Sequence, residues 1–236
     1  MTFENEHMNS NRFSDSAGTP WSGRAFDVNN FAGDDGSAPA ALISAIAKFH
    51  SGEALAEDVV DAIRESRLLI PLLADLGESE IGSHGHKVDK SAELSIVTVA
   101  TPDDQIGLPV FSSVAAMQKW NPIARPVPAD ARRVALAAAA EGNTRIILDP
   151  ENETEFAVRR PAIAAIAQEL TWVHPARNLQ VFEELSSIVA QFDSFLKLEL
   201  QDCDATARLH SAELLLVMTL VPGLDQEAVA DLMQNF

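Results

Sequence analysis

Apolar residues along this chain recur at two spacings, one typical of strands and the other typical of helices. Near the middle, an apolar run at residues 108–111 predicts a short buried strand, and apolar residues three apart predict a helix over residues 113–120. Pro122 disfavours helical geometry at the residue before it, so a turn is expected there. A second extended run at residues 123–127 completes this central unit, whose helix is expected to pack one face against a sheet.

The same two spacings predict further elements on both sides of the central unit. Helices are expected at residues 40–49, 53–65, 129–141, 161–170 and 225–233. Strands are expected at residues 67–74, 92–100, 145–148, 155–159, 195–200 and 212–220. This alternation of strands and helices predicts a mixed α/β (α+β) fold, with a mixed sheet and flanking helices.

Changes in composition divide the chain into four regions. Residues 1–37 are polar with isolated aromatics and cannot close a core by themselves, so a mobile or loosely attached arm is expected. Residues 38–66 supply a helical pair that packs on the core, and residues 67–176 form the α/β domain. A small α+β unit at residues 177–236 completes or follows that domain. Within the domain, the polar, glycine-bearing residues 75–91 are expected to form a long exposed loop.

The net charge of the chain makes some classes of binding partner less favourable than others. The chain has 17 Lys plus Arg against 35 Asp plus Glu, which gives a formal charge of −18 at pH 7. A charge of this sign repels nucleic-acid phosphates and anionic lipid surfaces, so neither nucleic-acid binding nor membrane binding is expected. Solvation of an acidic surface is the simplest interpretation of this charge, and a basic partner is the main alternative.

Cysteine usage and the length of the apolar runs indicate the compartment. Cys203 is the only cysteine, so no intramolecular disulfide and no multi-cysteine metal site can form. The first residues lack the basic and apolar segments of a secretory signal. The longest apolar runs, such as residues 214–221, are far shorter than the roughly 18 residues that a membrane-spanning helix needs. A cytoplasmic protein is therefore expected.

The order of several short motifs resembles that of a known family. The motifs are Leu-Ile-Pro-Leu-Leu at residues 69–73, Gly-Leu-Pro-Val-Phe-Ser-Ser-Val at 107–114, Trp-Asn-Pro-Ile-Ala-Arg-Pro-Val-Pro at 120–128, Ile-Leu-Asp-Pro at 147–150 and Arg-Pro-Ala-Ile-Ala-Ala at 160–165. In this order they resemble the SseB N-terminal domain, in its actinobacterial form, over about residues 67–176. The resemblance implies a soluble α/β protein without an agreed biochemical activity, and it brings no catalytic residues to this chain.

The sequence contains no pattern typical of a catalytic or cofactor site. It has neither a Gly-x-Ser-x-Gly nucleophile motif nor a glycine-rich phosphate loop. Ser112 and Ser113 are therefore interpreted as helix caps. Cys203 stands between Asp202 and Asp204, which argues against a reactive thiolate because neighbouring negative charge raises a thiol pKa. No catalytic residue and no cofactor are assigned.

The histidines offer only weak candidate chemistry. His84 and His86 share a polar loop with carboxylates, so a metal ion could in principle find ligands there. A solvated loop is favoured, because flexible glycine-flanked loops do not preorganise metal ligands. His174 precedes a proline in the connector after the α/β domain, and a packed or surface histidine is favoured over a catalytic one. No metal site is assigned.

Trp120 and Arg125 are the strongest candidates for a binding surface. Prolines at positions 122, 126 and 128 stiffen the segment that carries them, and Trp and Arg often anchor protein interfaces. Arg132 and Arg133 lie downstream and could extend a local basic face that attracts an acidic partner. The alternative is that Trp120 belongs to the core and that Arg125 makes an internal salt bridge.

These observations predict a non-catalytic interaction or regulatory module that binds another protein, or a small anionic metabolite, around Trp120, Arg125, Arg132 and Arg133. One competing hypothesis is a hydrolase whose site assembles only in the fold, for instance from His174 and scattered acids. Another is an oligomerising scaffold, which a large exposed apolar patch on the C-terminal unit would support. The oligomeric state is left open.

Overall fold

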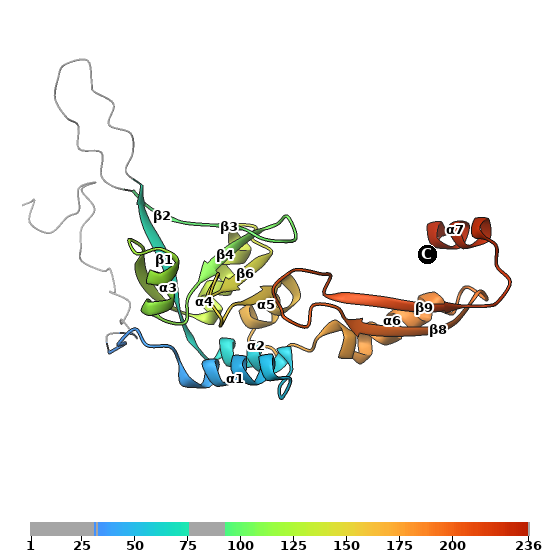
Figure 1. The fold of residues 1–236 in the computed structure, drawn as a ribbon, viewed down its shortest axis with the longest axis horizontal. Helices are drawn as coiled ribbons and strands as arrows, with labels where there is room; N and C mark the ends of the chain where they lie inside the picture. Colours follow the sequence, from blue (N-terminus) through green and yellow to red (C-terminus); the bar gives the residue numbers. More distant parts are fainter. Residues whose placement is uncertain (1–30, 32, 76–92, 236) are drawn as a thin grey trace, which may run out of the picture. The chain divides into compact units, whose positions relative to one another are not determined.

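The computed structural model describes residues 31, 33–75 and 93–235 (Figure 1). Every described helix and strand belongs to the unit Asp35–Phe236. The expected arm at residues 1–37 lies almost wholly outside the described residues, and so does the expected loop at residues 75–91. Both remain predictions.

Two sheets form the α/β body. In the first, β1 lies between β2 and β5, and both pairings are antiparallel. In the second, the strand order is β3-β4-β6-β7, in which β4 and β6 are parallel and the outer pairings are antiparallel. The strands are β1 (Arg67–Asp75), β2 (Glu93–Ile96), β3 (Val99–Ala100), β4 (Ile106–Val110), β5 (Arg125–Asp130), β6 (Arg145–Leu148) and β7 (Phe156–Arg159).

An isolated bridge joins the two sheets. The backbone N–H of Leu69 in β1 donates to the carbonyl of Phe111 at 2.8 Å, and the N–H of Phe111 donates back to the carbonyl of Leu69 at 2.9 Å. Mixed pairing and flanking helices confirm the predicted mixed α/β fold.

Four helices share one core with these sheets. They are α1 (Ala40–Ser51), α2 (Ala56–Arg64), α4 (Ala131–Ala140) and α5 (Arg160–Ala167), and their apolar faces supply much of the largest buried cluster. Leu148 of β6 and Phe156 of β7, both almost fully buried, belong to the same cluster.

The central unit folds largely as its sequence predicts. Helix α3 (Val114–Trp120) starts at Ser113, whose hydroxyl accepts a hydrogen bond from the N–H of Ala116. Its apolar face packs with Leu69 and Phe111 in a second, smaller cluster. The predicted cap and the predicted packing of this helix on a sheet are both confirmed.

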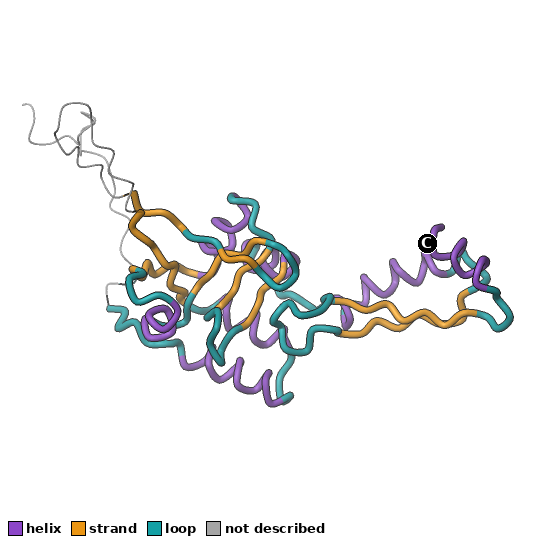
Figure 2. Tube along the Cα trace, turned by 45° about the horizontal axis from the view of Figure 1, so that its top comes forward, coloured by secondary structure: helices purple, strands orange, loops and turns teal. Residues whose placement is uncertain are grey.

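The C-terminal part follows a short 3₁₀ turn and contains two helices and a hairpin (Figures 1 and 2). Strands β8 and β9 pair with each other, antiparallel, in a sheet of two strands, and α6 contacts β8. The elements are η1 (Pro175–Arg177), α6 (Leu179–Val189), β8 (Phe195–Asp202), β9 (Leu214–Leu220) and α7 (Gln226–Asn235).

Two expectations about individual elements need correction. The run at residues 92–100 is not one strand, because β2 and β3 belong to different sheets and the chain must bend between them. Ile123 lies in the turn, since β5 starts only at Arg125. Helix α6 is an additional element that the sequence analysis did not predict. Within the part of the chain that the structure describes, no helix has the length and apolar content to cross a membrane.

Candidate functional site

The turn between α3 and β5 presents an exposed apolar side chain in a fixed position. The carbonyl of Asn121 accepts a hydrogen bond from the N–H of Ala124 at 3.1 Å, and its side-chain oxygen accepts from the N–H of Ile123 at 3.1 Å. Ile123 is 77% exposed on this turn. The turn therefore holds a large apolar group in water at a position that the backbone cannot easily change.

Trp120 and Arg125 flank that turn. The ring of Trp120 is half-buried and packs on Phe111, with centroids 5.3 Å apart and the planes tilted by 41°. Arg125 opens β5 and is exposed, as is Val127, which lies on the same face of the strand. We call Trp120, Ile123, Arg125 and Val127 the α3–β5 surface. Among the described residues, Arg125 has no ion pair, so its guanidinium is available to a ligand.

Strand β5 lies at the edge of its sheet, because its only strand partner within the described residues is β1. Pro126 and Pro128 lack N–H donors, which suits an edge and discourages pairing with a further strand. Binding at this surface is therefore expected to use side chains, not strand addition.

The structure does not bring all four predicted binding residues together. Arg132 and Arg133 lie in the first turn of α4, beyond the end of β5. At ~3.4 Å per residue, the length of β5 from Arg125 to Asp130 is about 17 Å. Arg132 contacts α5, where its Nε donates to the carbonyl of Ala167 at 3.3 Å and its Nη1 lies 3.7 Å from Glu169. Trp120 and Arg125 thus form one candidate surface, and the two later arginines lie apart from it.

A buried carboxylate near α3 was missed by the sequence analysis. Asp149 follows β6, is fully buried, and accepts hydrogen bonds of 2.7 Å from the N–H and the hydroxyl of Ser112 and from the hydroxyl of Thr154. Ser112 is therefore held by Asp149 and does not cap α3. With its oxygens satisfied inside the protein, Asp149 positions the end of β4 against the end of β6.

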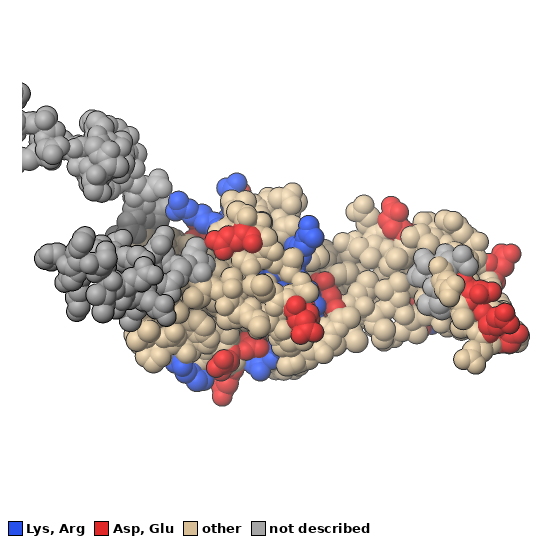
Figure 3. Space-filling view, turned by 90° about the horizontal axis from the view of Figure 1, so that it is seen from above, with Lys and Arg blue, Asp and Glu red and all other residues tan. Residues whose placement is uncertain are grey.

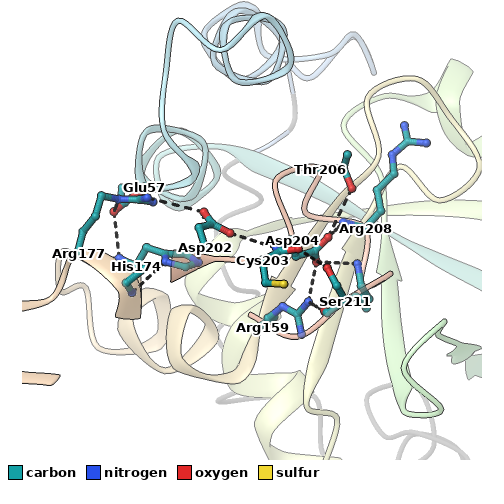
Figure 4. A network of polar contacts seen from close by, with 12 residues as sticks. Glu57, Arg159, His174, Arg177, Asp202, Cys203, Asp204, Thr206, Arg208 and Ser211 are labelled. Atoms are coloured by element: carbon teal, nitrogen blue, oxygen red, sulfur yellow. Dashed lines mark hydrogen bonds and ion pairs between the residues drawn. The ribbon is translucent and has the colours of Figure 1, made fainter. Parts of the chain in front are cut away.

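Charged side chains also gather where the body meets the C-terminal part (Figure 4). Glu57 of α2 accepts two hydrogen bonds from the Arg177 guanidinium, at 2.8 and 2.7 Å, and one from the N–H of His174 at 3.0 Å. Asp202 at the end of β8 lies 3.5 Å from Nε2 of His174 and 3.7 Å from Nη1 of Arg177. We call Glu57, His174, Arg177 and Asp202 the junction cluster.

Each titratable group of this cluster responds to its surroundings. Burial raises the pKa of Glu57, but hydrogen bonds from Arg177 and from the backbone outweigh it, so the pKa lies below its ordinary value. Burial lowers the pKa of His174 and outweighs the opposite effect of Asp202. The hydrogen bond to Glu57 raises the pKa of Arg177 above its ordinary value. At neutral pH the cluster therefore contains a firmly charged Glu57–Arg177 pair beside a neutral imidazole.

His174 is poorly placed for proton transfer to a substrate. Its ring is almost fully buried, Nδ1 accepts a hydrogen bond from the N–H of Ala176 at 3.2 Å, and Nε2 faces Asp202. Both ring nitrogens are thus engaged within the protein, and the side chain caps the 3₁₀ turn. This geometry gives no support to a hydrolase built on His174.

A second group of charges extends from the junction cluster into the body. Asp204 accepts a 2.6 Å hydrogen bond from Arg159, whose guanidinium also donates to the carbonyl of Ser211 at 2.7 Å. Asp103 pairs with Arg145 at 2.8 Å; burial raises the pKa of Asp103, but hydrogen bonds from Thr101 and Arg145 outweigh it, so the pKa lies below its ordinary value. The contacts of Arg159 tie the loop between β8 and β9 to β7.

Between the two groups lies a cavity of about 30 Å³, lined by apolar residues and by His174, Asp202, Asp204 and Glu213. That volume accommodates about one water molecule and no organic substrate. Burial raises the pKa of Glu213. The charged contacts around this cavity position the C-terminal part on the body.

Among the described residues, no group of three potential metal-binding side chains gathers in one place. His84 and His86 lie outside the described residues. The sequence analysis also did not identify Ile123 as a candidate, although the Asn-Pro dipeptide before Ile123 predicts the turn that exposes this side chain. Glu57 and Arg177 could not be paired from sequence, because they lie 120 positions apart.

Comparison with known proteins identifies one relationship. The family model described as the SseB protein N-terminal domain matches residues 40–165, so the match includes α1 and α2 together with β1 to β7. No curated protein and no solved structure matches the chain.

Proposed function

We propose, from the premise that this chain belongs to the SseB family, that it acts in the cytoplasm by binding another protein through the α3–β5 surface. The proposal concerns recognition and involves no chemical step. The observation that carries it is the 77% exposure of Ile123 on a turn that two hydrogen bonds hold in place.

The preorganised turn supports this function energetically. An apolar side chain that is already fixed loses little conformational freedom on binding, so more of its burial contributes to affinity. Complete burial of an isoleucine side chain contributes roughly 1.5–3 kcal/mol. Trp120 supplies a half-buried ring beside the turn, and Arg125 supplies a charge for a carboxylate of the partner. An acidic partner segment with an apolar residue fits this combination.

Capture of the tagged full chain from its own cell extract, followed by mass spectrometry, tests the proposal. The test variant is Ile123→Ser/Arg125→Glu, which changes exposed groups only. The matched control is Ile106→Ser, since Ile106 is 59% exposed outside the α3–β5 surface. We expect a partner that the wild type and the control retain and the test variant loses. A partner that all three retain, or no partner at all, contradicts the proposal.

A second candidate function is the binding of a small anionic metabolite. The observation that favours it is an open hollow of about 560 Å³ lined by His50, Glu153, Thr206, Arg208 and His210. The two histidines give this hollow donors for a carboxylate or phosphate, and Arg208, which also donates to the backbone carbonyls of Asn152 and Glu153, adds a positive charge. Thermal-shift screening of anionic metabolites against the wild type and Arg208→Ala tests it, and a stabilisation that the variant retains in full contradicts it.

A further inference from the structure

The C-terminal unit, which we define as α6, β8, β9 and α7, has almost no core of its own. Among its described side chains, only Val189 is buried. A two-stranded hairpin is marginally stable in water unless another element packs on it, and in this unit such packing buries little apolar surface. This unit therefore exposes apolar groups that a self-contained domain would cover.

The exposed apolar side chains of this unit gather on α6 and on the hairpin. Leu179 is 68% exposed and Phe182 is 41% exposed, and their spacing of three residues makes them neighbours on the helix. We call this pair the C-terminal surface. Further exposed apolar residues of the unit are Ile188, Leu196 and Leu215.

Acidic residues outnumber basic residues in the C-terminal unit. Its four elements contain six Asp and Glu and one Lys, Lys197, and the loops between them add four more acids and one Arg, Arg208. Lys197 pairs with Glu199 at 2.9 Å, and Arg208 donates to backbone carbonyls of the body. On the face drawn in Figure 3, the described residues of this unit show red carboxylates and no blue side chains. Glu183 and Glu184 adjoin the exposed pair on α6.

This charge selects among the occupants that could cover the surface. A second copy would bring its own Glu183 and Glu184 against those of the first, which is unfavourable. The segments of this chain outside the described ranges are not basic either: residues 1–30 contain four acids and two arginines, and residues 76–92 contain three acids and two lysines. A partner that combines apolar side chains with Lys or Arg matches both features of the surface.

We propose that the C-terminal surface, centred on Leu179 and Phe182, binds a basic amphipathic segment of another protein. The apolar side chains of that segment pack on α6, and its basic side chains pair with the carboxylates at residues 183 and 184. This site lies on elements other than the α3–β5 surface, and its charge preference is the opposite one. Each of the two proposals can therefore be tested independently of the other.

Selection from a displayed library of random 16-residue peptides on the immobilised full chain tests this inference. We expect enriched peptides that carry net positive charge together with Leu, Ile, Phe or Trp. A synthetic copy of one enriched peptide is then titrated by fluorescence anisotropy. We expect Leu179→Asp/Phe182→Asp and, separately, Glu183→Lys/Glu184→Lys to weaken binding at least about tenfold, and added salt to weaken it further.

Two control variants isolate the site. Leu136→Asp places the same change on an exposed leucine of α4, and Ile123→Ser/Arg125→Glu removes the α3–β5 surface; both should bind the peptide as the wild type does. Unchanged thermal unfolding midpoints verify that every variant is folded. Enriched peptides without a basic bias, or binding that survives both charge and apolar changes on α6, overturn the inference.

A failure to enrich any peptide also overturns it. Sedimentation then identifies the alternative occupant: a dimer that Leu179→Asp/Phe182→Asp dissociates would show that a second copy covers the surface.

Discussion

The α/β body and the C-terminal unit have similarly apolar sequences but bury them very differently. In the body, side chains from four helices and from both sheets merge into one large buried cluster, in which Leu148 and Val134 are fully enclosed. In the C-terminal unit, only Val189 is buried among the described side chains. The body therefore carries the stability of the fold, and the C-terminal unit carries the apolar surface that remains for a partner.

The contacts that join the two regions combine ion pairs with one small apolar cluster, in which Leu209 of the β8–β9 loop packs with Ile147 and Ala157. One hydrogen-bonded ion pair joins Arg177 to Glu57, and another joins Arg159 to Asp204. Such pairs fix orientation well, but their desolvation cost offsets much of their attraction. The C-terminal unit is thus positioned by charges and gains little stability from the body core.

The largest expected effect is a core truncation in the body. Leu148→Ala removes a fully buried side chain of β6 and should reduce the free energy of unfolding by about 2–5 kcal/mol, because it leaves a cavity in close-packed surroundings. Urea denaturation of the full chain measures this loss. The matched change in the C-terminal unit, Leu216→Ala in β9, removes a half-buried side chain and should cost about 1 kcal/mol or less. Equal losses would remove the contrast between the regions.

A somewhat smaller effect is expected at the buried carboxylate of the body. Asp149→Ala leaves the N–H and hydroxyl of Ser112 without their acceptor and should cost about 3 kcal/mol. Thr154→Val removes only one of the three donors and should cost about 1 kcal/mol. Both values come from the same urea experiment. If Asp149→Ala were no more costly than Thr154→Val, the carboxylate would not be organising the ends of β4 and β6.

Breaking the junction cluster should act locally. Arg177→Ala removes both hydrogen bonds to Glu57 and should make the amides of β8 and β9 exchange with solvent about fivefold faster, which corresponds to ~1 kcal/mol. Amides of β6 should be unaffected. Arg132→Ala, which removes an exposed pair with Glu169, is the control and should change neither region.

The pH dependence of the junction should be smaller still. Because the pKa of His174 is lowered in the folded protein, the unfolded chain binds a proton more readily below about pH 6.5. His174 therefore contributes stability above that pH, and this contribution is lost as the pH falls from about 6.5 towards the folded pKa. Urea denaturation between pH 7 and pH 5.5 should show a decline that is weaker in His174→Gln.

Glu213 has the opposite pH dependence: because its pKa is raised in the folded protein, it contributes stability at acid pH, and this contribution is lost as the pH rises through the folded-state pKa. The comparison of wild type with His174→Gln cancels this contribution. A variant profile that parallels the wild type would show that His174 does not titrate differently in the two states.

The sequence predicted the body better than the C-terminal unit, for a physical reason. Strong local signals such as the Ser113 cap, Gly142 after α4 and the apolar strand runs repeat what the core requires, so sequence pattern and burial agree. Helix α6 was missed although Val181, Phe182, Leu185, Ile188 and Val189 recur at helical spacing, and the structure leaves most of these side chains unburied.

The candidate sites were only partly predictable. Trp120 and Arg125 could be recognised because residue type and stiff prolines are local properties. The exposure of Ile123 depends on the turn geometry, and the pairing of Glu57 with Arg177 depends on long-range packing. Local patterns contain neither kind of information.

Hydrogen exchange of the free full chain, measured amide by amide, tests the contrast between the two regions most directly. Amides of β4 and β6 should exchange only through global unfolding, whereas amides of β8 and β9 should exchange about 1,000-fold faster, because little buried apolar area opposes their opening. Equal protection of the hairpin and the body would contradict the account, since it would show that the apolar side chains of the C-terminal unit are already covered in the free protein.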